Sequence, residues 1–207
     1  MRALCVSLLM LAMTGPALAD ECSKDVLAAF SKQRASKAFR VEFSQPTAEG
    51  EVHMKIDYMP PDKMLQTVES PAMPGEQQTM LVGNRAFAGS GGAFEELLPQ
   101  FTQSIISEFN NAVGAPANLG TFECLGHAKV DGRDYLAFRT AEKVAPGADT
   151  SKIMARTIYV DEATGKPAFN VIAALTGDAP PALKVKYSYP TDVEIIAPAN
   201  APVQKLQ

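Results

Sequence analysis

Hydrophobic and polar residues alternate with a period of two over much of the chain. The first two such stretches flank a turn-rich segment at 45–50, and their apolar members are Phe39, Val41, Phe43, Val52, Met54, Ile56 and Tyr58. This period is typical of β-strands that bury one face and expose the other. The pattern predicts antiparallel strands over about 39–44 and 51–58.

Further strand-like stretches follow along the chain. They lie at about 63–69, 77–82, 84–88, 121–130, 133–141, 153–160, 168–175 and 183–189. Asp131-Gly132 separates two of them and is a strong signal for a tight hairpin, because both positions of that turn need a positive φ. An antiparallel sheet of nine or ten strands must twist and curl, or close on itself.

Two segments have helical spacing instead. Val26, Leu27 and Phe30 predict a helix over 23–37 with Ser23 as its N-cap, and a second helix is predicted over 98–114 with Pro99 in its first turn. The apolar stripe of the second helix has no other partner in a one-domain chain, so we expect it to cover the concave face of the sheet. The fold class predicted is mainly β with helices (α+β).

Four glycines, Gly83, Gly89, Gly91 and Gly92, precede the second helix. Gly89, Gly91 and Gly92 lie close together, but no Lys follows them and the neighbouring strands are antiparallel. A nucleotide-binding loop needs a Gly-Lys-Ser/Thr sequence or a parallel βαβ unit. We therefore interpret these glycines as a strand-to-helix corner that uses positive φ angles.

The ends of the chain indicate export. Residues 1–19 carry one charge, Arg2, an apolar run and a small-residue exit, which is typical of a secretory signal peptide cut before Asp20. Residues 20–207 are then expected to form one domain, with a loose tail rich in Ala and Pro from about 198. The cysteines that remain are Cys22 and Cys124. In an oxidising compartment they predict a disulfide, the alternative being two buried free thiols.

Charge and motifs argue against a nucleic-acid partner and offer no support for an enzyme or a metal site. The chain has 19 Lys and Arg against 23 Asp and Glu, and loss of Arg2 lowers the net charge from −4 to −5. This balance argues against a nucleic-acid partner. His53 and His127 fall on polar strand positions, and no hydrolase or metal-site motif accompanies them. We expect no catalytic residue, no metal and no cofactor, so the protein is predicted not to be an enzyme.

Large apolar residues are the remaining feature of the sequence that could indicate a binding function. The chain has ten phenylalanines and nine methionines, three of the latter in the predicted signal peptide. Phe39, Phe43, Met54, Met64 and Phe87 occupy strand positions that could share a face. Methionine suits surfaces that accommodate variable acyl chains, but such a set of residues also fits an ordinary core. Composition leaves both interpretations open.

The order of these features resembles a known superfamily. The stretches that carry the resemblance are Phe39 to Gln45, Gly50 to Ile56, the Pro60-Pro61 breaker, "LVGNRAF" at 81–87, "YVDEATGKPAFNVI" at 159–172 and "VKYSYPTDVEIIAP" at 185–198. They are similar to the periplasmic lipoprotein carriers LolA and LolB, their mycobacterial lipid-carrying relatives and the N-terminal domain of the regulator RseB. In the carriers a basic residue before the breaker helps to hold a lid; residues 57–59 here are Asp, Tyr and Met.

The resemblance implies an unclosed, curved antiparallel half-barrel with helices covering its concave face and an apolar cavity for acyl chains. It implies a periplasmic carrier of lipid or of an acylated protein, expected to be a monomer. The alternative is a regulatory or sensor module of the same fold that docks on a membrane protein. The residues expected to bind acyl chains are Phe39, Val41, Phe43, Val52, Met54, Ile56, Met64, Phe87, Phe101 and Ile105.

Overall fold

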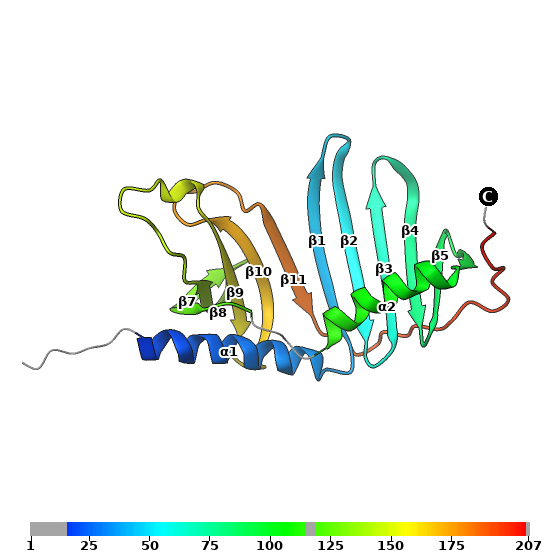
Figure 1. Ribbon diagram of the computed structural model, residues 1–207, viewed down its shortest axis with the longest axis horizontal. Coiled ribbons are helices and arrows are strands. Elements are labelled where there is room, and N and C mark those ends of the chain that lie inside the picture. The colour runs from blue at the N-terminus through cyan, green and yellow to red at the C-terminus, as the bar shows by residue number, and fades with distance from the viewer. Residues whose placement is uncertain (1–15, 115–118, 206–207) are drawn as a thin grey trace, which may run out of the picture.

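In the computed structural model, which describes residues 16–114 and 119–205, the chain forms one curved sheet that carries two helices (Figure 1). The sheet has eleven strands within those residues, and every neighbouring pair is antiparallel. The strands are β1 (Phe39–Thr47), β2 (Gly50–Met59), β3 (Lys63–Ser70), β4 (Met73–Val82), β5 (Arg85–Ser90), β6 (Ala93–Glu96), β7 (Phe122–Val130), β8 (Arg133–Thr140), β9 (Met154–Asp161), β10 (Lys166–Ala174) and β11 (Leu183–Ser188). A short 3₁₀ turn, η1 (Thr150–Lys152), precedes β9.

The strand order is β6-β5-β4-β3-β2-β1-β11-β10-β9-β8-β7, so β6 and β7 are the two edges and do not pair with each other. Two meanders are joined where β1 pairs with β11. The predicted fold class is therefore confirmed: this is an unclosed, curved antiparallel barrel with helices on one face. Asp131 (φ 49°) and Gly132 (φ 80°) form the predicted tight turn between β7 and β8.

The predicted glycine corner is instead a hairpin. Gly91 (φ 59°) and Gly92 (φ 84°) adopt the expected positive φ angles, but they connect β5 to β6 rather than a strand to a helix. Strand β6 was not predicted, because the apolar and acidic residues at 94–96 equally fit the approach to a helix. Its pairing with β5 supplies the backbone partners that favour an extended conformation there.

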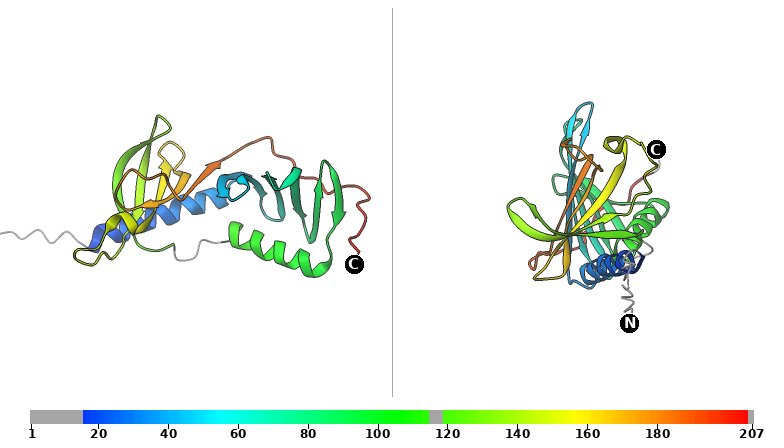
Figure 2. Two further views of the ribbon diagram at one scale, coloured as in Figure 1. Left: turned by 90° about the horizontal axis from the view of Figure 1, so that it is seen from above. Right: turned by 90° about the vertical axis from the view of Figure 1, so that its left-hand side faces the viewer.

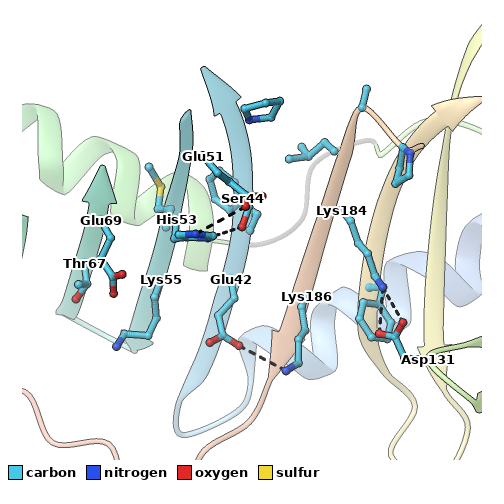
Figure 3. Close-up of a pocket in the computed structure, with 17 residues that line it drawn as sticks. Glu42, Ser44, Glu51, His53, Lys55, Thr67, Glu69, Asp131, Lys184 and Lys186 are labelled. Carbon is cyan, nitrogen blue, oxygen red and sulfur yellow. Dashed lines mark hydrogen bonds and ion pairs between the residues drawn. The ribbon is translucent and has the colours of Figure 1, made fainter. Parts of the chain in front are cut away.

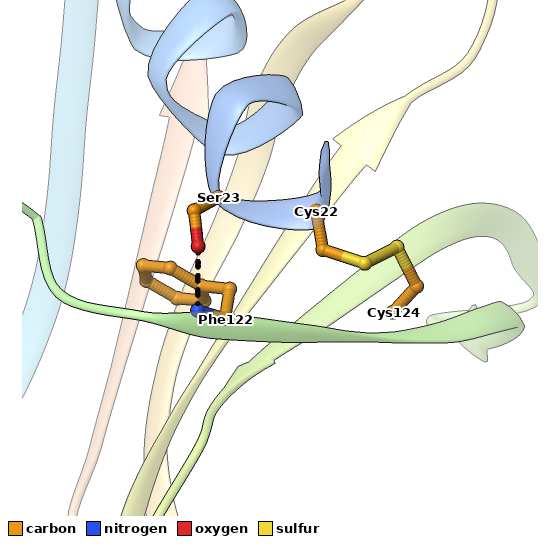
Figure 4. Close-up of a disulfide and its surroundings, with 4 residues drawn as sticks. All are labelled: Cys22, Ser23, Phe122 and Cys124. Atoms are coloured by element: carbon orange, nitrogen blue, oxygen red, sulfur yellow. Dashed lines mark hydrogen bonds between the residues drawn. A yellow bond between two sulfur atoms is a disulfide. The ribbon is translucent and has the colours of Figure 1, made fainter. Parts of the chain in front are cut away.

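Helix α1 (Pro16–Arg34) lies across β7, β9 and β10. It begins earlier than predicted, so Ser23 is inside the helix rather than at its N-cap, and the Ser23 hydroxyl accepts a hydrogen bond from the Phe122 N–H at 2.9 Å (Figure 4). Cys22 forms the predicted disulfide with Cys124 of β7, with the two Cα atoms 5.4 Å apart. The α1 side chains Val26 and Phe30 belong to the core cluster beneath this helix. Most of the predicted signal peptide lies outside the described residues.

Helix α2 (Pro99–Val113) covers the other half of the same face, as expected, and Pro99 occupies its first turn. Phe109 of α2 is buried among residues of β1, β2, β3, β4 and β5, which are Phe39, Tyr58, Met64, Leu81 and Ala86. Neither helix is long and apolar enough to cross a membrane, within the ranges that the structure describes.

The segment after β11 crosses to the opposite face. Ile195 is 1 % exposed and packs there with Met80 and Phe87, so α2 and this segment lie on either side of the same strands (Figure 2). The Glu96 N–H donates to the Pro202 carbonyl and the Gln204 N–H donates to the Glu96 carbonyl, each at 2.8 Å. The loose tail expected from about 198 is therefore tied to β6 over residues 202–204.

Candidate functional site

The central strands place a row of half-buried apolar side chains on the face that carries both helices. Phe43 lies opposite Met54 on one side and Val185 on the other, and Met54 lies opposite Val68. We refer to this row as the apolar strip, made of Phe43, Val52, Met54, Val68, Leu183 and Val185. Val185 is buried and the other five are half-buried.

The apolar strip begins where the cover from α2 ends. Val41 and Ile56, one step along β1 and β2, pack against the cluster under α2. The strip residues follow at the next positions on the same face, because side chains alternate along a strand. None of them belongs to the packed clusters found among residues 16–114 and 119–205. Apart from the buried Val185, these side chains form an apolar surface outside the clusters that pack under the two helices.

Eight of the ten predicted site residues lie on this helix side. Phe39 and Met64 are buried beneath α2, with Val41, Ile56 and Ile105 packed against them. Phe43, Val52 and Met54 belong to the apolar strip. The structure thus divides the eight residues into a covered core and an uncovered strip.

The other two predicted site residues are placed elsewhere. Phe87 is buried on the opposite face against Ile195, because in β5 the small Ala86 faces α2 and its neighbour Phe87 points away. Phe101 is 48 % exposed at the start of α2, next to a surface hollow that Val203 also lines. Where both faces of a strand are covered, consecutive residues are apolar and the alternation of apolar and polar residues disappears. The sequence pattern therefore could not assign Phe87 to one face of the sheet.

Two polar features bound the covered core. Arg34, the last residue of α1, donates a hydrogen bond to the carbonyl of Gly114, which caps α2, so one guanidinium connects the ends of both helices. Burial raises the pKa of Tyr58, beneath α2, to about 12. Its ring stacks on Phe39 with the centroids 4.8 Å apart.

A second hollow, of about 780 Å³, lies on the face opposite the helices (Figure 3). Lysines and carboxylates alternate across it, and two pairs are formed: Lys184 with Asp131 at 3.0 Å and Lys186 with Glu42 at 3.9 Å. The sequence did not predict this hollow. Its wall depends on the turn between β7 and β8 curling over β11, which are distant in the chain.

This hollow contains one pair that could suggest chemistry. Ser44 Oγ and His53 Nδ1 are 2.7 Å apart, and His53 Nε2 is 3.8 Å from a Glu51 carboxylate oxygen. Ser44 and His53 are directly opposite on β1 and β2, and His53 is exposed, as predicted. A cross-strand hydrogen bond accounts for this pair. Among the described residues, no three His, Cys, Asp or Glu side chains are grouped so that they could hold a metal ion.

Comparison of the sequence with protein-family models and with curated proteins gives no match. Solved structures do match. LprF from Mycobacterium bovis is 13 % identical with a TM-score of 0.56, covering 87 % of this chain and 98 % of its own. The Mycobacterium tuberculosis lipoprotein LppX is 10 % identical with a TM-score of 0.54, covering 86 % of this chain and 99 % of its own. MucB is 15 % identical with a TM-score of 0.49, covering 91 % of this chain and 66 % of its own. The chain therefore shares its fold, an unclosed and curved antiparallel sheet with two helices, with LprF and LppX.

Proposed function

We propose that this protein is an exported, periplasmic carrier that binds the acyl chains of lipids or lipoproteins on the apolar strip. The observation that carries the proposal is a run of half-buried apolar side chains on the helix-bearing face, outside the packed clusters. The disulfide between Cys22 and Cys124 is consistent with an oxidising compartment.

The apolar strip offers a physical basis for holding an acyl chain. Each methylene removed from water contributes about 0.8 kcal/mol, so a chain that lies along several strands gains affinity by length alone. The strip residues come from β1, β2, β3 and β11, which span the middle of the sheet. Binding of this kind needs no covalent chemistry, and a monomer is sufficient for it.

The carrier proposal is tested by lipid analysis and by one pair of variants. The exported protein is purified, examined by native mass spectrometry and extracted for lipids, and its binding of oleyl alcohol is measured by calorimetry. Met54→Lys places a charge on the apolar strip and is expected to weaken binding about tenfold or more. His53→Lys, at the adjacent position on the opposite face, is the matched control and should bind as the unmodified protein does.

Two outcomes would contradict the carrier. Equal binding by the Met54→Lys and His53→Lys variants would place the acyl chain away from the apolar strip. The second outcome is a protein that purifies without lipid, does not bind oleyl alcohol and instead captures a membrane protein. This outcome would favour the regulatory module of the same fold.

A further inference from the structure

Two arginines on the helix-bearing face have no acidic partner. Arg40, Arg85 and Arg139 each pair with a carboxylate: Asp57, Glu96 and Glu123 respectively. Arg34 and Arg156 do not, because within residues 16–114 and 119–205 no carboxylate oxygen lies within 4.0 Å of either guanidinium. Both side chains are half-buried.

Both arginines lie in the neighbourhood of one pair of aromatic residues, Phe30 and Tyr187. The Arg156 guanidinium lies 5.8 Å from the centre of the Phe30 ring, and Phe30 precedes Arg34 by one turn on α1. The Phe30 ring meets the Tyr187 ring edge-on at 6.0 Å. Residues one turn apart share a helix face, so Arg34 lies on the same face of α1 as Phe30, and the charges of Arg34 and Arg156 both act on Tyr187.

Their remaining polar contacts are neutral. Arg156 Nε donates to Asn170 Oδ1 at 3.1 Å, and Arg34 donates to the Gly114 carbonyl. Arg34 Nε is buried without a hydrogen-bond partner. Burial lowers the pKa of Arg34 and raises the pKa of Tyr187, whereas the positive charges of Arg156 and Arg34 act to lower the Tyr187 pKa. Two partly desolvated cations near one another are unfavourable unless an anion compensates them.

Arg156 and its hydrogen-bond partner Asn170 lie beside the apolar strip. Asn170 is directly opposite Val185, which is opposite Phe43. Arg156 is opposite Ile172, which is opposite Leu183. Asn170 is thus one strand away from the strip residue Val185, and Arg156 is two strands away from the strip residue Leu183, all on the same face.

From this arrangement we propose that Arg34 and Arg156 bind the anionic head group of an amphiphile whose acyl chain lies on the apolar strip. The inference rests on the proposed function and specifies its ligand class. The head group is a carboxylate or a phosphate, since guanidinium forms paired, charge-assisted hydrogen bonds with both. A fatty acid and an anionic lysophospholipid are the two sources of this chemistry.

The test compares ligands that share a chain and differ in charge. Binding of oleate, oleyl alcohol and 1-oleoyl lysophosphatidate to the purified exported protein is measured by calorimetry. Arg34→Gln and Arg156→Gln are each expected to weaken oleate or lysophosphatidate binding about tenfold or more, and to change oleyl alcohol binding less than about twofold. Arg133→Gln, which removes an exposed arginine at the far end of β8, is the matched control. Which of the two anions binds more tightly identifies the source.

The ratio of oleate to oleyl alcohol affinity within each variant removes the effect of any misfolding, which would weaken both. Arg34→Lys and Arg156→Lys keep the charge and should retain most of the preference for the anion. Equal binding of oleate and oleyl alcohol, unchanged by either Gln substitution, would overturn the head-group site and leave the carrier intact. Failure of oleate, lysophosphatidate and oleyl alcohol all to bind would overturn both proposals.

Discussion

Arg40 of β1 and Asp57 of β2 form a two-hydrogen-bond ion pair on the sheet face opposite the helices. Arg40 Nε lies 2.7 Å from Asp57 Oδ1 and Arg40 Nη2 lies 3.0 Å from Asp57 Oδ2. The Asp57 side chain is only 6 % exposed. The pair joins the first two strands directly before the Pro60-Pro61 breaker. Removing one partner leaves the other partly buried and unpaired, which costs more than losing a surface pair.

We therefore expect Asp57→Asn to lower the free energy of unfolding by about 1 to 3 kcal/mol. The control is Glu123→Gln, which breaks the ion pair with Arg139, where the glutamate is 46 % exposed. That substitution should cost about 0 to 1 kcal/mol. Urea unfolding followed by circular dichroism measures both. Equal losses of unfolding free energy in the two variants would mean that the burial of Asp57 does not make its ion pair more important than an exposed one.

Ile195 and Ile196 provide a test of the segment after β11. Ile195 is 1 % exposed against Met80 and Phe87, and Ile196 is 65 % exposed. Ile195→Ala should destabilise the protein by about 2 to 4 kcal/mol, because it removes buried methyl groups and leaves a cavity. Ile196→Ala should change stability by less than about 0.5 kcal/mol. Thermal or urea unfolding of the two variants compares adjacent residues of one type, and a small effect at both positions would show that the segment does not contribute to the core.

The disulfide between Cys22 and Cys124 closes a loop with a sequence separation of 102 residues. Replacing both cysteines with serine should lower the free energy of unfolding by about 3 to 5 kcal/mol, since a cross-link of this span restricts the unfolded chain. Dithiothreitol should destabilise the unmodified protein to a similar extent and leave the double variant unchanged. If dithiothreitol destabilised the double variant as well, the reagent would be acting on something other than this disulfide.

The pair between Arg85 and Glu96 predicts sensitivity to acid at the β6 edge. A hydrogen bond from Arg85, together with its charge, holds the pKa of Glu96 below its ordinary value of 4.5. The contribution of this carboxylate is fully present above that value and is lost as the pH falls through the lower pKa of the folded state. The stability difference between the unmodified protein and Glu96→Gln should therefore shrink below about pH 4.5. Glu95→Gln, which removes the exposed neighbouring carboxylate, should show no such trend. Unfolding curves at intervals from pH 7 to pH 3 measure it.

Several elements could be predicted because their causes are local. The side chains of β1 and β2 alternate between two environments, so Phe43 and Met54 share a face as soon as both strands form. Asp131-Gly132 and Pro99 act through backbone angles that neighbouring residues hardly alter. The pairing of Cys22 with Cys124 could be predicted because residues 20–207 contain no other cysteine.

Other features depend on segments that meet only in the folded chain. Phe87 faces away from α2 because a segment more than a hundred residues later covers that side of β5, as the contact with Ile195 shows. Strand β6 depends on the backbone at 202–204 as well as on β5. Arg156 meets Phe30, one turn before Arg34 on α1, through the packing of α1 on the sheet. The sequence by itself determined ten of the eleven strands, the Asp131-Gly132 turn and the alternation of side chains along β1 and β2, because these follow from backbone geometry and the period of side chains. Only the tertiary structure decided which surfaces are covered and which charges lack partners, because burial and desolvation depend on what packs against each face.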